Sequence, residues 1–88
     1  METIDVYEDS AATLYCPEPF GYPKPLAAWV RNDVILQNSS SDMVLNVTTI
    51  KTSDNGSDID CVVSNKHGSD YHRFILNVKS KFLLHDKI

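Results

Sequence analysis

The chain has 88 residues, 42% of which are hydrophobic, and its formal net charge at pH 7 is −4. This length suffices for one small domain with a single two-layer core, and it excludes a second domain or a deep substrate cavity. The eight basic residues are scattered and no apolar run is long enough to cross a bilayer, so we expect neither a nucleic-acid partner nor membrane insertion.

The first part of the chain predicts two short strands over residues 3–15, broken at the polar turn Glu8-Asp9-Ser10. Leu14 and Cys16 share one parity, so both side chains are expected to point inward. Four prolines follow between residues 17 and 25. Because proline cannot donate to a strand ladder, this segment is expected to be an exposed loop.

Residues 27–36 predict a strand that carries Trp29 inward, a tight turn at Asn32-Asp33 and a returning strand. Residues 37–42 are polar and turn-forming. Residues 43–47 then alternate between apolar and polar side chains, which indicates a half-buried strand. Its inward side chains are Met43, Leu45 and Val47.

Residues 52–57 have the densest turn chemistry in the chain, and the alternation then resumes. A strand around Cys61 and a last strand ending near Lys79 are joined by a hairpin at residues 65–68. Their inward side chains are Ile59, Cys61 and Val63 in the first strand and Phe74, Leu76 and Val78 in the second. No segment has sustained helical periodicity, which favours an all-β fold.

Cys16 and Cys61 bracket Trp29, which describes a core in which a disulfide packs against an indole. A bridge closing a loop of that length constrains the unfolded chain by about 4 kcal/mol in the entropic model. The alternative is a pair of buried free thiols, because the redox compartment decides which form exists. The predicted core residues are Trp29, Leu14, Leu45 and Val63.

Three further patterns accompany this frame. Residues 21–33 are similar to G-x-P-x-P-x-x-x-W followed by W-x-K-D/N-G, residues 45–50 to L-x-I-x-x-V, and residues 61–68 to C-x-A-x-N-x-x-G. In order and spacing they resemble the intermediate, or I-set, domains of the immunoglobulin superfamily over about residues 3–79.

The resemblance implies an all-β, immunoglobulin-like two-sheet Greek-key sandwich of seven to eight strands with one inter-sheet disulfide. It places the domain at residues 1–79 and leaves residues 80–88 as a C-terminal tail or a linker to the next domain of a larger protein. That segment contains Phe82-Leu83-Leu84, which we expect to pack on the sandwich or to extend the last strand.

The chain departs from the family pattern at one corner, where D-x-G-x-Y-x-C is replaced by a segment one residue longer and without the tyrosine. Ile59 occupies the tyrosine position and can only fill space. We expect Asp58 to bond the backbone amides of the turn instead, and the corner to be looser than in the relatives.

No catalytic or metal-binding pattern emerges. Asp54, Asp58 and Asp60 resemble the start of a calcium loop, but the central glycine and the distal glutamate are lacking, and no cysteine and histidine cluster suggests zinc. The three histidines are His67, His72 and His85, and they are separated and lack a triad-like context. We therefore expect no enzyme activity, no metal and no cofactor.

Three N-x-S/T sequons are candidate N-glycosylation sites at Asn38, Asn46 and Asn55, and they favour a secretory route. Asn46 is the most informative because it lies in mid-strand. Alternation points it outward from the sheet that the resemblance builds from strands A, B, E and D, where a glycan would shield that face. A partner is then expected to use the other sheet.

On that other sheet, alternation places Val30, Val62 and Ile75 on the outer face of strands C, F and G. We predict that they are cross-strand neighbours and form an apolar protein interface, with Arg73 and Tyr71 supplying a polar rim. The alternatives are that these residues reflect strand propensity alone, or that a neighbouring domain covers them.

The functional prediction is an extracellular or cell-surface, protein-binding immunoglobulin domain of an adhesion or recognition protein. Its partner is another protein or a second copy of the chain, bound through the C-F-G face. One alternative is a ligand-binding ectodomain module of a receptor kinase. The other is an intracellular, muscle-type structural spacer with reduced cysteines.

Overall fold

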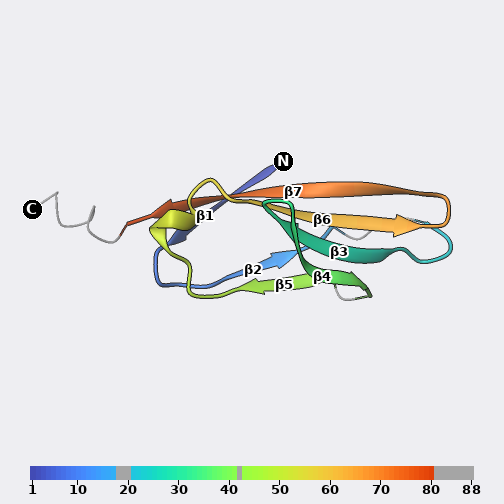
Figure 1. Ribbon diagram of the computed structural model, residues 1–88, viewed down its shortest axis with the longest axis horizontal. Coiled ribbons are helices and arrows are strands. Elements are labelled where there is room, and N and C mark those ends of the chain that lie inside the picture. The colour runs from blue at the N-terminus through green and yellow to red at the C-terminus, as the bar shows by residue number, and fades with distance from the viewer. Residues whose placement is uncertain (18–20, 42, 81–88) are drawn as a thin grey trace, which may run out of the picture.

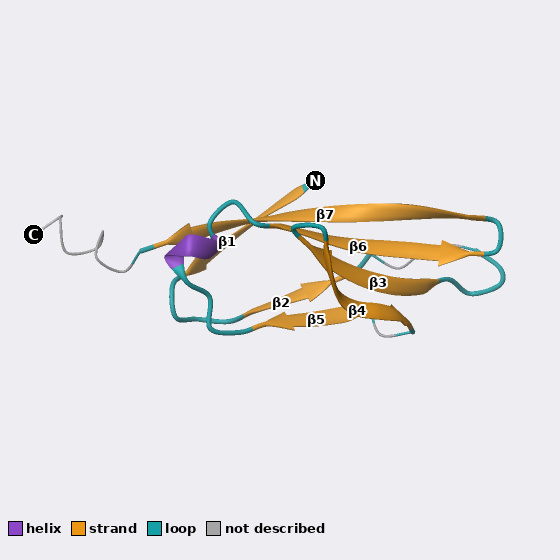
Figure 2. Ribbon diagram, in the orientation of Figure 1, coloured by secondary structure: helices purple, strands orange, loops and turns teal. Residues whose placement is uncertain are grey.

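The computed structural model describes residues 1–17, 21–41 and 43–80. These residues form an all-β sandwich of seven strands in two sheets, with a single three-residue 3-10 turn, η1 (Thr52–Asp54), as the only described helical element (Figures 1 and 2). The strands are β1 (Glu2–Tyr7), β2 (Ala12–Tyr15), β3 (Leu26–Arg31), β4 (Val34–Ser40), β5 (Val44–Val47), β6 (Asp58–Asn65) and β7 (Gly68–Lys79).

The two layers have unequal numbers of strands. One sheet has the strand order β1-β7-β6-β3-β4, and the other contains only β2 and β5 (Figure 1). The predicted fold class is confirmed, but the predicted membership of the smaller sheet is wrong. β1 does not join β2, because it pairs in parallel with β7 from Glu2↔Phe74 to Tyr7↔Lys79, and no described strand occupies the position of strand D.

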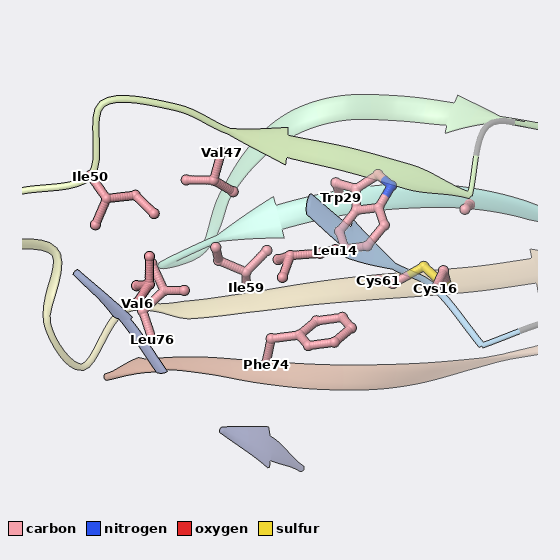
Figure 3. Close-up of a cluster of buried hydrophobic side chains, with 11 residues drawn as sticks. Val6, Leu14, Cys16, Trp29, Val47, Ile50, Ile59, Cys61, Phe74 and Leu76 are labelled. Atoms are coloured by element: carbon pink, nitrogen blue, oxygen red, sulfur yellow. A yellow bond between two sulfur atoms is a disulfide. The ribbon is translucent and has the colours of Figure 1, made fainter. Parts of the chain in front are cut away.

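The core lies between the sheets around the Cys16–Cys61 disulfide, whose Cα atoms are 5.9 Å apart (Figure 3). Trp29 is directly opposite Cys61 in the β3–β6 ladder and stacks against Phe74 with ring centroids 6.1 Å apart. Its indole Nε1 has no hydrogen-bond acceptor among the described residues, so packing alone holds the ring. Of the predicted core, Trp29 and Leu14 are fully buried, whereas Leu45 and Val63 are half-buried against it.

The predicted turn at Asn32-Asp33 joins β3 to β4, and both residues have positive φ, as a two-residue hairpin of type I′ requires. The following strand is longer than predicted. Residues 37–40 were expected in a polar turn, but they continue β4 because a bulge opposite Trp29 lets the ladder resume at Ala27↔Ser40. Polar residues are tolerated there because β4 is an edge strand.

The corner without tyrosine is closed by other bonds. The Asp54 carboxylate accepts a hydrogen bond from the Lys51 N–H (2.8 Å) and forms an ion pair with Arg31 (2.6 Å). Asn55 Oδ1 accepts a hydrogen bond from the Val78 N–H (2.8 Å). The role predicted for Asp58 therefore belongs to Asp54 and Asn55. The carboxylate of Asp58 instead faces Arg73 at 3.9 Å, because alternation turns it away from the corner.

We predict that replacing both cysteines by alanine lowers the free energy of unfolding by about 4 kcal/mol, because the unfolded chain regains the entropy of a 45-residue loop. Urea unfolding of the oxidised wild type and of the Cys16→Ala, Cys61→Ala variant measures this difference. Adding a reductant should destabilise the wild type and leave the variant unchanged. Equal midpoints and slopes for the two proteins would contradict a structural role of the bridge.

We predict that Asp54→Ala lowers the free energy of unfolding by roughly 1–3 kcal/mol, since it leaves Arg31 and the Lys51 N–H without their acceptor. Asp70→Ala is the matched control, because that carboxylate accepts a hydrogen bond from the amide of the adjacent Tyr71 and joins no distant segments. Its cost should stay within ~0.5 kcal/mol. Similar losses for both variants would show that Asp54 does not close the corner.

Candidate functional site: the outer face of the five-stranded sheet

The side chains that are buried in the core identify the inner face of the larger sheet, and the remaining side chains lie on its outer face. Ala27 and Trp29 in β3 and Ile59 and Cys61 in β6 are buried against the smaller sheet. Successive side chains of a strand point to opposite faces, so the residues between them face outward. The same alternation in β7 buries Phe74 and turns its neighbours outward.

A contiguous group of apolar side chains lies on this face. Val62 is opposite Ala28 on one side and Tyr71 on the other, and Val30 is opposite Ile35. Leu26 precedes Ala28 with the same outward parity. We call this group the outer apolar patch: Leu26, Ala28, Val30, Ile35, Val62 and Tyr71.

The register corrects the predicted patch. Val30 and Val62 belong to the group, but Ile75 is opposite Asp58 in β6 and Thr3 in β1. It is separated from Val62 by the row in which Asp60 faces Arg73. The prediction that Val30, Val62 and Ile75 are cross-strand neighbours is therefore wrong. Alternation gives the face on which a side chain lies but not the residue opposite it on the neighbouring strand.

Sequence reasoning also missed Leu26 and Ile35, although a signal for both was present. Leu26 has the parity opposite to Trp29, which alternation alone places outward. Ile35 follows from the two-residue turn, since a hairpin closing at Asn32-Asp33 puts Ile35 opposite Val30. Deriving the register of the β3–β4 hairpin from its two-residue turn would have identified Ile35 from the sequence.

Two charged side chains, Asp60 and Arg73, lie opposite each other beside the patch, whereas Tyr71, predicted with Arg73 as a polar rim, lies within the patch opposite Val62. The Arg73 guanidinium makes two parallel bonds to the Asp60 carboxylate, Nε–Oδ1 at 2.8 Å and Nη2–Oδ2 at 3.0 Å. These bonds raise the pKa of Arg73 above its ordinary value. Its Cζ lies 5.7 Å from the centroid of the Tyr71 ring. The two parallel hydrogen bonds hold the Arg73 and Asp60 side chains in place, so a partner would meet a preorganised charged rim.

The rim encloses an open hollow of about 490 Å³. It is lined by Asp60, Val62, Ser69, Asp70, Tyr71 and Arg73. Aliphatic, aromatic and charged groups therefore meet at one place on an outward face, which is the composition of protein contact surfaces.

The other candidate chemistry is dispersed. Asp54 faces Arg31, whereas Asp58 and Asp60 face Arg73. Within residues 1–17, 21–41 and 43–80, no group of three or more potential metal ligands comes together. His72 Nε2 lies 3.0 Å from Glu2 Oε1 and ties β7 to β1, His67 is in the β6–β7 turn, and His85 lies outside the described residues.

The three sequons lie in different settings. Asn46 is exposed on β5, and its Oδ1 accepts a hydrogen bond from Thr13 Oγ1 (2.9 Å), which orients the amide at the outward face of the smaller sheet. Asn55 uses its Oδ1 at the corner described above. Asn38 lies in β4, but its side chain is outside the described part of the structure, as is the segment Phe82-Leu83-Leu84.

The described part of the chain contains no helix that is both long and apolar enough to cross a bilayer.

Comparison with known proteins gives likeness in fold. No family model and no curated protein matches the chain. Among solved structures, extracellular domains 3–5 of Drosophila OTK superpose with a TM-score of 0.73 at 21% identity over 86% of the chain, and Sidekick-1 immunoglobulin domains 1–4 with 0.72 at 23% over 89%. The chain spans 28% and 20% of these two structures.

Two titin structures are similar to the same degree. The I-band fragment I67–I69 gives a TM-score of 0.74 at 24% identity over 91% of the chain and 30% of the fragment. Titin domain M7 gives 0.72 at 24% identity over 90% of the chain and 87% of that domain. The chain therefore has an immunoglobulin-like fold, and the likeness covers one domain of larger proteins.

Proposed function

We propose that the chain is an I-set immunoglobulin domain of an extracellular adhesion or recognition protein, and that it binds another protein through the outer apolar patch. The patch itself carries this proposal. Tyr71 is 60% exposed, Ile35 61% and Leu26 43%. They lie on one face, where Ala28, Val30 and Val62 connect them beside the ordered pair Asp60–Arg73. A small domain that exposes such a cluster gains free energy when a partner removes it from water.

The outward side of the smaller sheet is proposed to have a different role. Asn46 presents its side-chain amide there, and Thr13 holds the Oδ1. A glycan on Asn46 would shield β2 and β5 from contacts and leave the outer apolar patch open. The role is binding and not catalysis, and it requires no cofactor or metal.

An extracellular setting is supported by the disulfide and by the sequons, since oxidising compartments maintain structural disulfides. A ligand-binding module of a receptor kinase ectodomain would use the same face. The second candidate is an intracellular structural spacer, which the likeness in fold to titin favours. Titration of free thiols in protein from its native source separates the two settings, because a spacer in a reducing compartment keeps Cys16 and Cys61 reduced.

We predict that Tyr71→Lys weakens binding to a protein partner at least tenfold, because it places a charge in the outer apolar patch. The partner is found by screening the multimerised domain against a panel of purified cell-surface ectodomains that includes the domain itself, and its affinity is then measured by surface plasmon resonance.

Tyr15→Lys is the matched control, since Tyr15 is an equally prominent tyrosine (68% exposed) on the outward side of the smaller sheet. It should bind like the wild type. Both variants must keep the wild-type melting temperature. A partner whose affinity falls with Tyr15→Lys and not with Tyr71→Lys would place the interface on the other layer and refute the proposal.

We predict that Asn46 is glycosylated when the chain is secreted from a eukaryotic cell. Thr48→Ala removes the sequon without changing the asparagine. The intact mass should then fall by one glycan, and glycosidase treatment in heavy-oxygen water should mark Asn46 in the wild type only. An unmodified Asn46 peptide from secreted wild-type protein would contradict the shielding role.

A further inference from the structure

β4 is the most exposed apolar segment among the described strands. Val34, Ile35 and Leu36 are 62%, 61% and 48% exposed, and they are consecutive. Ile35 lies on the outer face opposite Val30, and Val34, opposite Arg31, lies on the face toward the smaller sheet. Leu36 is the bulged residue between the pairs Val30↔Ile35 and Trp29↔Gln37 and has no opposite residue in β3. The smaller sheet has two strands in the described part of the chain, and it leaves both Val34 and Leu36 exposed. β4 is thus apolar on both faces.

The edge of β4 is also unpaired. β4 ends the strand order of the larger sheet, and no described strand pairs with it on the side away from β3. In a two-residue hairpin the pair next to the turn, Arg31↔Val34, exchanges hydrogen bonds, and the next pair, Val30↔Ile35, does not. The N–H and C=O of Ile35 therefore point toward the open edge.

These two features select the kind of partner that fits. A protein docking flat on the outer face would cover Ile35 but leave Val34 in water. A strand added along the edge would meet the free N–H and C=O of Ile35 and cover all three side chains, because its own side chains lie on both faces.

Charge favours a second copy of the same strand. In antiparallel pairing centred on Ile35, Val34, Ile35 and Leu36 of one copy meet the same three residues of the other. None of them is charged or a proline, so two copies meet without repulsion and without a missing donor. The other edge of this sheet, β1, carries Glu2 and Asp5, which would bring carboxylates together. Antiparallel pairing centred on Ile35 is two-fold symmetric: Ile35 meets Ile35 of the second copy, and Val34 meets Leu36.

We propose that two copies of the chain associate by antiparallel pairing of their β4 strands, centred on Ile35, to form one continuous sheet. This association uses the edge of the sheet and does not depend on the partner proposed for the outer apolar patch.

Cysteine cross-linking tests the register. In the pairing proposed, the Cα atoms of Ile35 and its counterpart are about 5.5 Å apart, within reach of a disulfide, whereas those of Val34 and its counterpart are offset by two residues and exceed about 7 Å. Ile35→Cys should therefore cross-link into a dimer under mild oxidation, at least tenfold faster than Val34→Cys. The two positions are equally exposed, so accessibility does not distinguish them. Equal rates would overturn the proposal.

Sedimentation equilibrium of protein made without N-glycans supplies the second test. Val34→Thr combined with Leu36→Thr should weaken the dimer at least tenfold, whereas Tyr71→Lys should leave it unchanged, because Tyr71 is on the outer face and not at the edge. Circular dichroism and melting verify that each variant is folded. A wild type that stays monomeric up to about 1 mM would overturn the proposal. A dimer disrupted by Tyr71→Lys alone would also overturn it and would identify the outer apolar patch as a homophilic surface.

Discussion

The cross-link between Cys16 and Cys61, beside the Trp29 indole, is the interaction on which the sandwich depends. A two-stranded sheet is marginal by itself in water. Here β2 and β5 pair over only four residues each, and their apolar side chains gain stability by packing on the larger sheet. The disulfide ties the end of β2 to the centre of β6. This covalent bond opposes separation of the smaller sheet from the larger one.

The unequal layers explain where this domain exposes apolar surface. A four-stranded partner layer would extend past β5 and shield the inward side of β4. With the two strands described it does not, and Val34 stays exposed. The domain is therefore well packed around Trp29 and incompletely covered at one edge. Such an edge is a liability for a soluble domain unless another strand or a partner covers it.

Alternation allowed the sequence to predict which side chains enter the core. Trp29, Leu14 and Cys61 follow from parity, because one face of each strand is buried and period two leaves no other choice. Pairing partners were not predictable in the same way. β1 could have joined either sheet, and the choice of β7 depends on a ladder whose partner is more than 70 residues away in the sequence.

The same limit explains the outcome at the candidate site. Val30 and Val62 were placed on the correct face, but the error at Ile75 arose because parity fixes the face and not the position along the strand. The role of Asp54 at the corner was missed for a similar reason. Its partner Arg31 lies on β3, 23 residues earlier, and no local pattern links the two.

The outer apolar patch and the β4 edge share one residue, and this makes their roles separable. Ile35 contributes its side chain to the patch and its backbone to the edge, whereas Tyr71 belongs only to the patch and Val34 only to the edge. If two chains pair along β4, their outer faces become one surface with the two Ile35 side chains at its centre. A partner with two-fold symmetry or with tandem repeats would then gain effective concentration from binding both patches at once. Weak affinity at each patch would suffice, because the pairing of the sheet supplies the second site.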